Sequence, residues 1–129
     1  MASEWNDPRP MAPHLQIWRW HPAMMSSILH RASAIICYAG LIKVALGLLI
    51  LALTGSLPLE SLIFSPVGAF GLFVFLSAFI FTAFAQLRHA VWDRGGMFDP
   101  DMNNRLSWVM IVSALILALL LTILATGVL

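Results

Sequence analysis

Charged residues are scarce in this sequence. Asp, Glu, Lys and Arg make up 10% of its 129 residues and hydrophobic residues 60%, whereas soluble domains carry about 25% charged residues. The net charge of +1 gives no indication of nucleic-acid binding. A single cysteine, Cys37, excludes both a disulfide framework and a thiolate metal site built from this chain alone. The composition therefore indicates a membrane protein.

An apolar core is missing from residues 1–10, which contain acidic residues and prolines instead. We therefore expect neither a secretory signal nor an Arg-rich transit peptide, as in a bacterial protein, an organelle-made protein or a matured one. Residues 1–22 are predicted to form an extended arm and an interfacial segment, because the indole rings of Trp18 and Trp20 favour the headgroup layer.

Three apolar stretches are each long enough to cross a bilayer, which takes about 20 residues. They predict an all-α membrane anchor over residues 23–129, with membrane-spanning helices at about 30–54, 62–91 and 106–128. Candidate N-caps for the third helix are Asp101, Asn103 and Asn104.

The basic residues indicate how these helices are oriented in the membrane. Every arginine lies in the N-terminal region or at the connection between the second and third helices, whereas the first connection and the C-terminus contain no Lys or Arg. The positive-inside rule then places the N-terminus on the cytoplasmic side, or on the matrix side in a mitochondrion. The tryptophans map to the same side, which we expect to dock a soluble partner.

Polar and ionisable side chains mark the start of the first apolar segment. Ser27, His30, Arg31 and Ala34 fall on one face of a helix at about 100° per residue. Two interpretations stay open, because such groups either bind a ligand at membrane depth or extend into the headgroup layer as a stop signal.

A second polar cluster, residues 88–93, ends the second predicted helix. His89 and Asp93 are four residues apart and are expected to pair on one helical face. Because the first two helices run antiparallel, this cluster should lie at the same depth as Ser27 and Arg31. The convergence of polar groups favours a ligand site near the interface over headgroup anchoring.

Three segments together resemble the large membrane-anchor (cytochrome b) subunit of succinate dehydrogenase, respiratory complex II. They are Arg9–Trp18, Ser27–Arg31 and Arg88–Asp93, and their order and spacing extend over nearly the whole chain. The resemblance implies a four-subunit enzyme in which a flavoprotein oxidises succinate, an iron–sulfur subunit carries electrons, and two small anchors bind ubiquinone and usually haem b. This chain would be one anchor, a non-catalytic subunit in a bacterial or mitochondrial inner membrane.

The resemblance also implies roles for individual residues. Ser27 and Arg31 match the quinone-site serine and arginine, and their hydroxyl and guanidinium groups can donate hydrogen bonds to a quinone carbonyl. The fixed charge of Arg31 would also stabilise a partly reduced, anionic quinone. Positions near the haem propionates are matched by His30, Arg31 and His89. The surface that meets the iron–sulfur subunit is matched by Trp92 and Asp93.

The sequence departs from the family pattern where the family has its haem ligand. Thr82 stands at the position of the axial histidine. Gln86 replaces a glycine that lets the porphyrin approach the helix closely, and Ala34 replaces another glycine. We therefore expect this chain to supply no haem ligand, so that haem b is either absent or held at the interface with the second anchor.

Lys43 is a further departure. It lies 12 residues past Arg31, which is about 18 Å deeper along a helix. A lysine at the bilayer centre costs about 2.5–3.5 kcal/mol and needs a partner. The chain offers no acid within a predicted span, so that partner would come from another subunit or a lipid.

Three alternatives to a succinate:ubiquinone anchor stay open. The same scaffold serves a fumarate reductase that uses a lower-potential quinone. A purely structural anchor would leave Ser27 and Arg31 without a role in quinone binding. A small transporter or channel built around Lys43 would function without partner subunits.

Overall fold

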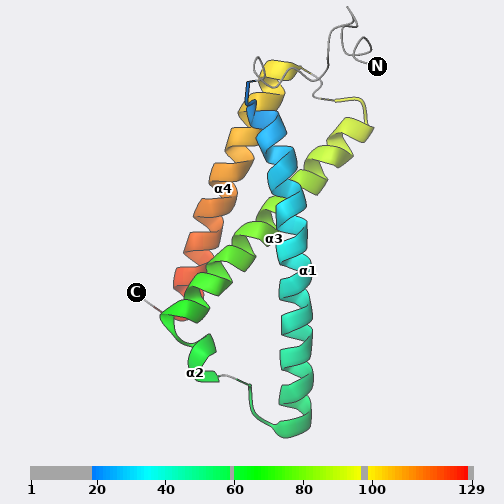
Figure 1. Cartoon of the computed structure of the whole chain (residues 1–129). Coiled ribbons are helices and arrows are strands. Elements are labelled where there is room, and N and C mark those ends of the chain that lie inside the picture. Colours follow the sequence, from blue (N-terminus) through cyan, green and yellow to red (C-terminus); the bar gives the residue numbers. More distant parts are fainter. Residues whose placement is uncertain (1–18, 59, 97–98, 128–129) are drawn as a thin grey trace, which may run out of the picture.

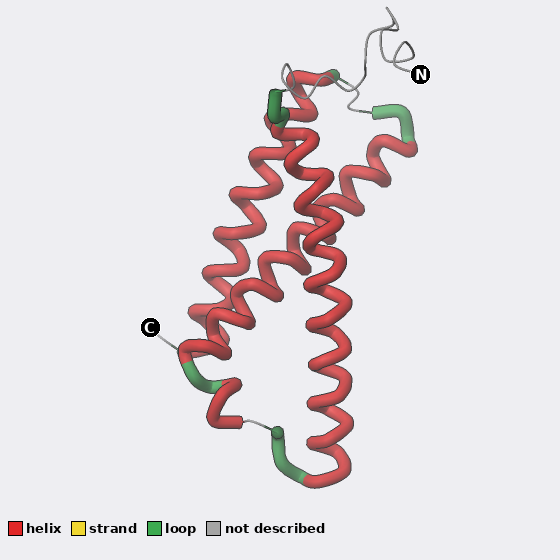
Figure 2. The backbone as a smooth tube through the Cα atoms, viewed as in Figure 1, coloured by secondary structure: helices red, strands yellow, loops and turns green. Residues whose placement is uncertain are grey.

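The computed structural model describes residues 19–58, 60–96 and 99–127. Over these residues the chain is helical with short connections and contains no strand (Figures 1 and 2). The helices are α1 Pro22–Thr54, α2 Glu60–Ile63, α3 Pro66–Asp93 and α4 Pro100–Thr126. Helices α1, α3 and α4, of 33, 28 and 27 residues, are long and apolar enough to cross a membrane. The prediction of an all-α protein with three membrane-spanning helices is therefore confirmed.

Proline begins each of the three long helices, and two of them start earlier than the predicted spans. Pro22, Pro66 and Pro100 occupy the first turn, where the missing N–H is not needed and the fixed φ is already helical. Helix α1 starts at Pro22, so it extends about two turns beyond the predicted membrane span, which begins at about residue 30. Helix α4 likewise starts at Pro100 instead of at about residue 106.

Polar caps decide where α3 and α4 begin. The hydroxyl of Ser65 accepts a hydrogen bond from the Gly68 N–H at 3.3 Å. Helix α3 therefore starts after it, at Pro66 rather than near residue 62, and residues 60–63 form the separate helix α2. Asp99 caps α4, its carboxylate accepting from the Asp101 N–H at 3.1 Å. The predicted caps were wrong, because the helix already includes Asp101, Asn103 and Asn104.

Helix α3 is the central element, because its contacts with α4 and with α1 are both more extensive than the contact between α1 and α4. Figure 1 shows it crossing α1 at an angle. The interface between α3 and α4 combines small and large apolar side chains, with Ala85 and Ala114 almost fully buried beside Phe81 and Met110. Small residues let membrane helices approach closely, while most of the large apolar side chains lie on the outside, where lipid would surround them.

Candidate functional site

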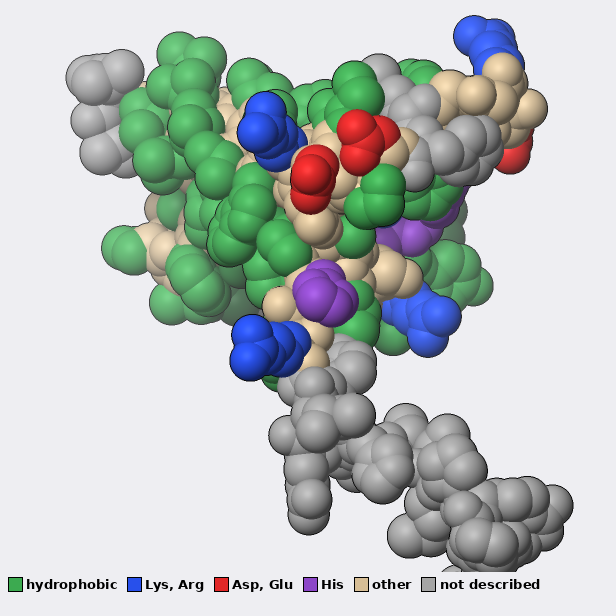
Figure 3. Space-filling model, turned by 90° about the horizontal axis from the view of Figure 1, so that it is seen from above, with side chains coloured by type: hydrophobic (Ala, Val, Ile, Leu, Met, Phe, Trp, Pro, Cys, Tyr) green, Lys and Arg blue, Asp and Glu red, His purple; other side chains and the backbone are tan. Residues whose placement is uncertain are grey.

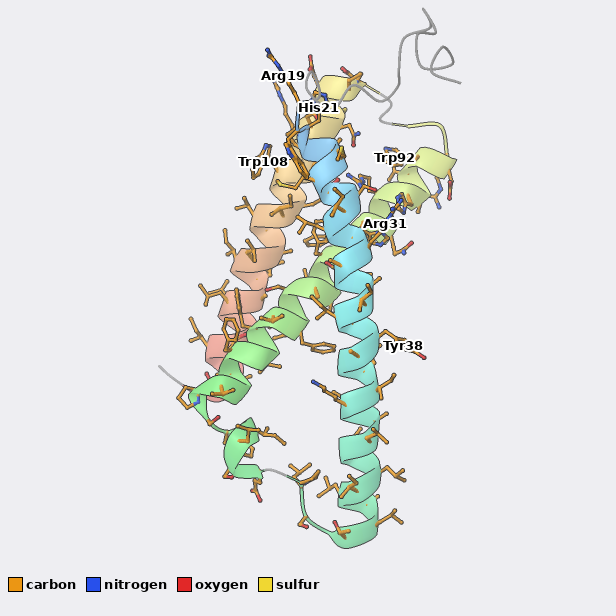
Figure 4. All side chains as sticks on the ribbon, in the orientation of Figure 1. Arg19, His21, Arg31, Tyr38, Trp92 and Trp108 are labelled. Carbon is orange, nitrogen blue, oxygen red and sulfur yellow. The ribbon has the colours of Figure 1, made fainter. Side chains whose placement is uncertain are left out.

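Most of the charged and histidine side chains of the described residues gather at one end of the bundle. The N-terminus of α1, the C-terminus of α3 and the N-terminus of α4 meet there, and Figure 3 shows this end from above. Figure 4 places the labelled Arg19, Arg31, Trp92 and Trp108 at this end, with Tyr38 further along α1. Trp5, Trp18 and Arg9 lie outside the described residues.

A buried arginine joins the three long helices at this end. Arg88 of α3 is 8% exposed, and its Nη1 donates to the hydroxyl of Ser26 in α1 at 3.0 Å and of Ser107 in α4 at 3.1 Å. The two hydroxyls lie 3.3 Å apart. Each also donates to a carbonyl of its own helix, Ser26 to Ala23 at 2.7 Å and Ser107 to Asn103 at 2.8 Å.

Four buried polar atoms in and beside this cluster have no hydrogen-bond partner among the described residues. They are Nε of Arg88, Nε1 of Trp92, Nε2 of His30 and Oδ1 of Asn103. Arg88 also lies over the indole of Trp92, with its Cζ 4.7 Å from the ring centroid, but no carboxylate in the described part of the chain pairs with it. Buried polar groups are almost always satisfied, so an acceptor oxygen or a carboxylate from outside these residues would complete this cluster.

The two histidines predicted to lie at one depth do meet. The rings of His30 in α1 and His89 in α3 are edge to face with centroids 5.6 Å apart, and His89 also lies 5.4 Å from Trp92. The predicted pair between His89 and Asp93 was wrong, because the imidazole instead lies between the rings of His30 and Trp92. Asp93 is exposed at the end of α3.

The polar stretch at the start of α1 divides between two faces. Ser26, Ser33 and Cys37 point into the bundle and are buried, and His30 is half-buried beside them. Ser27 and Arg31 lie one turn apart on a neighbouring face, about 100° around the helix, and both are exposed. The face predicted to carry His30, Ser27 and Arg31 therefore borders the bundle, with His30 on its inner edge and Ser27 and Arg31 on its exposed part.

The positions that depart from the family pattern lie deeper along the helices. The hydroxyl of Thr82 in α3 lies 3.8 Å from the sulfur of buried Cys37 in α1, so two side chains in contact fill this place. Gln86 is exposed. The described residues contain no group of three or more His, Cys, Asp or Glu side chains that could hold a metal ion. Because a threonine hydroxyl does not replace an imidazole, the contact between Thr82 and Cys37 does not fit a haem iron at position 82.

The family described as "Succinate dehydrogenase/Fumarate reductase transmembrane subunit" matches residues 6–106 of the chain. The chain belongs to this family. Two similar proteins are each named succinate dehydrogenase cytochrome b560 subunit, mitochondrial. The one from Mus musculus is 30% identical over 119 residues, which cover 87% of this chain and 66% of the mouse protein. The one from Sus scrofa is 30% identical over 112 residues, which cover 83% of this chain and 66% of the pig protein.

As a succinate dehydrogenase/fumarate reductase transmembrane subunit, the chain is a membrane anchor. The resemblance carried by its three polar segments is thereby confirmed at the level of the family. Sequence reasoning missed Ser26 and Ser107, which together hold Arg88. The signal that could have found them is a small hydroxyl residue at the polar end of an apolar helix, because serine is common where membrane helices touch.

Proposed function

We propose that this transmembrane subunit anchors a succinate:ubiquinone oxidoreductase in an inner membrane and supplies Ser27 and Arg31 to its quinone-reduction site. The observation that carries the proposal is their position. A hydroxyl and a guanidinium stand one turn apart on an exposed face of α1, at the end where Figure 4 places Arg19, Trp92 and Trp108. Neither has a hydrogen-bond partner among the described residues.

The chemistry of quinone reduction suits these two groups. A quinone carbonyl accepts hydrogen bonds, and its oxygen gains negative charge as each electron arrives. Ser27 would donate a neutral hydrogen bond to that oxygen, and Arg31 a charge-assisted one that strengthens as the charge develops. Because both side chains face away from this chain's own bundle, the rest of the site would come from the iron–sulfur subunit and the second anchor.

The other polar residues at this end would form the surfaces toward those partners. Trp92 and Asp93 end α3 beside the connection to α4, where the iron–sulfur subunit, with the flavoprotein behind it, would dock. His30 and His89 would lie toward the second anchor. The unpartnered nitrogens of His30 and Trp92 support an acceptor contributed across one of these interfaces.

The test replaces Ser27 and Arg31 in the intact, purified complex. Ser27→Ala should slow succinate-dependent ubiquinone reduction about fivefold, which corresponds to the free energy of one neutral hydrogen bond. Arg31→Leu should slow it about 10- to 100-fold, which corresponds to the free energy of a charged hydrogen bond. Electron transfer from succinate to a soluble dye that accepts electrons before the quinone should stay unchanged in both variants.

Two controls separate chemistry from damage to the membrane part. Arg31→Lys keeps the charge and should retain more activity than Arg31→Leu. Ser56→Ala removes an exposed hydroxyl at the opposite end of α1 and should have no effect. Unchanged ubiquinone reduction in Ser27→Ala and Arg31→Leu would leave the chain as a purely structural anchor. A complex that reduces fumarate faster than it oxidises succinate would favour the fumarate reductase assignment.

A further inference from the structure

A cavity of about 760 Å³ opens between α1 and α3, and Lys43 is the one charged residue that lines it. Its other walls are apolar and include Gly40, Gly47 and Val44 of α1 and Gly71 of α3. Arg31 of the proposed quinone site does not line this cavity. Neither the polar end of the bundle nor the proposed quinone site accounts for this cavity.

Lys43 cannot reach either membrane surface from its place in α1. It lies 12 residues from Arg31 and 11 residues from Thr54, which are about 18 Å and about 16 Å along the helix. The hydrocarbon core of a bilayer is about 30 Å thick, so both positions fall at its edges and Lys43 at its middle. A lysine stem is far shorter than either distance, so its ammonium needs a partner at that depth, and an anion is the partner that attracts it most strongly.

The chain itself does not provide that anion. All of its acidic residues lie outside the middle of the three spans: Glu4, Asp7, Glu60, Asp93, Asp99 and Asp101. Among the described residues no carboxylate lies within ion-pair distance of Lys43. An acidic group that pairs with the Lys43 ammonium would therefore come from another molecule.

The cavity has the shape that a helix needs to pack closely. Gly47 of α1 and Gly71 of α3 are open to the cavity, because a Cβ added at either would meet no atom within 4 Å, whereas Gly40 already packs against the ring of Phe75 in α3. Almost every residue from Leu41 to Thr54 is exposed, so this half of α1 has no cover from the described residues. Small residues on an uncovered face let another transmembrane helix approach the backbone.

We propose that a transmembrane helix of the second anchor subunit packs into this cavity and pairs an Asp or Glu carboxylate with Lys43 near the bilayer midplane. The proposal rests on the proposed function for the existence of that partner. A lipid is the weaker occupant, because its phosphate stays in the headgroup layer about 15 Å away. A carboxylate on a membrane helix can instead be fixed at the depth of the ammonium, where a pair of opposite charges lowers the cost of burying both.

The test is photo-cross-linking in the intact complex, with benzoylphenylalanine placed at Val44 or at Leu49. Val44 lines the cavity, whereas Leu49 does not and lies on the opposite side of α1, about 140° away. We expect Val44→benzoylphenylalanine to cross-link to a peptide of the second anchor that contains Asp or Glu, and Leu49→benzoylphenylalanine not to. Cross-links from Val44 only to lipid, only to another copy of this chain, or to a peptide without an acid would overturn the proposal.

Variants of Lys43 test the charge itself. Lys43→Met leaves the partner's carboxylate buried and unpaired, so the second anchor recovered per tagged chain should fall more than about tenfold, while Lys43→Arg should retain it. Recovery unchanged in Lys43→Met would refute the ion pair. Exchanging the charges, Lys43→Asp with lysine at the cross-linked acid, should restore recovery.

These experiments distinguish a failure of the proposed function from a failure of the proposed helix in the cavity. Recovery of the iron–sulfur and flavoprotein subunits with the chain, and ubiquinone reduction by that complex, report on the proposed function alone. A complex that is active but gives no cross-link from Val44 to the second anchor would refute only the occupant of the cavity.

Discussion

Ser26 and Ser27 are neighbours in sequence but have different environments. Ser26 is fully buried and accepts a hydrogen bond from Arg88, whereas Ser27 is exposed. A step of about 100° around the helix separates a side chain that holds the bundle together from one that is free to meet a quinone. The resemblance to the family identified Ser27 from its motif, but no pattern in the sequence distinguished the buried role of Ser26.

The side chain at position 82 predicts the haem content of the complex. A hydroxyl does not replace an imidazole as an axial iron ligand, and the Thr82 side chain contacts Cys37 instead. We expect the dithionite-reduced-minus-oxidised spectrum of the purified complex to lack a b-type band, while succinate:ubiquinone activity is intact. A pyridine haemochrome assay on the same sample measures the haem content.

One haem per complex would contradict this prediction and would require both axial ligands to come from outside residue 82. Variants would then identify them. Loss of the band in His30→Gln or His89→Gln would implicate the facing imidazoles, and retention in both would assign the ligands to the partner subunits.

Three hydrogen-bonded side chains connect the long elements of the fold. Arg88 reaches residues 62 positions earlier and 19 positions later in the chain, so it fixes α1, α3 and α4 relative to one another. The interface lower in the bundle consists of apolar side chains, Phe81 and Ala85 of α3 with Met110 and Ala114 of α4, whose packing, unlike a hydrogen bond, is not directional. The serine–arginine cluster therefore sets the rotation of α1 and α4 against α3.

Removing one hydroxyl of this cluster should weaken the helix association measurably. Ser107→Ala deletes an acceptor of the Arg88 guanidinium, and hydrogen bonds between membrane helices contribute about 0.6–2 kcal/mol. We expect the free energy of unfolding to fall by about 1 kcal/mol, measured by denaturant titration of the complex in mild detergent.

Ser113→Ala is the matched control, because the Ser113 hydroxyl bonds only to the Met110 carbonyl of its own helix, at 3.3 Å. It should change stability by far less than Ser107→Ala. Equal effects of the two variants would mean that Arg88 finds other acceptors and that the cluster does not set the helix arrangement.

At the scale of the whole molecule, the distribution of charge predicts the orientation in the membrane. The connection between α1 and α2 has no basic residue, whereas Arg94 and Arg105 flank the connection between α3 and α4. The positive-inside rule puts the latter, with the N-terminus, on the cytoplasmic or matrix side. This side would then face the catalytic subunits.

Cysteine labelling checks this orientation in intact cells or mitoplasts. In a Cys37→Ser background, a membrane-impermeant maleimide should label Ser56→Cys directly and Arg94→Cys only after permeabilisation. Both native residues are exposed, so access and not burial decides the result. The reverse pattern would show that the docking end faces the other compartment.

The sequence by itself determined the elements and the family of this protein. Apolar runs longer than a bilayer span require helices, because only internal hydrogen bonds satisfy a backbone in lipid, and the prolines mark where those helices begin. Three polar segments in a fixed order identified the family that residues 6–106 match. The sequence also predicted that Thr82 supplies no haem ligand and that Lys43 needs a partner from another subunit or a lipid.

Only the tertiary structure decided which face of each helix is internal. Periodicity gives the angles between residues within one helix, but the rotation of that helix depends on side chains from distant segments that pack against it. The structure thereby showed that His30 is half-buried while Ser27 and Arg31 are exposed, paired His89 with His30 instead of Asp93, and joined Arg88 to Ser26 and Ser107. It also placed Lys43 on a cavity, because the oblique crossing of α1 and α3 leaves space beside it.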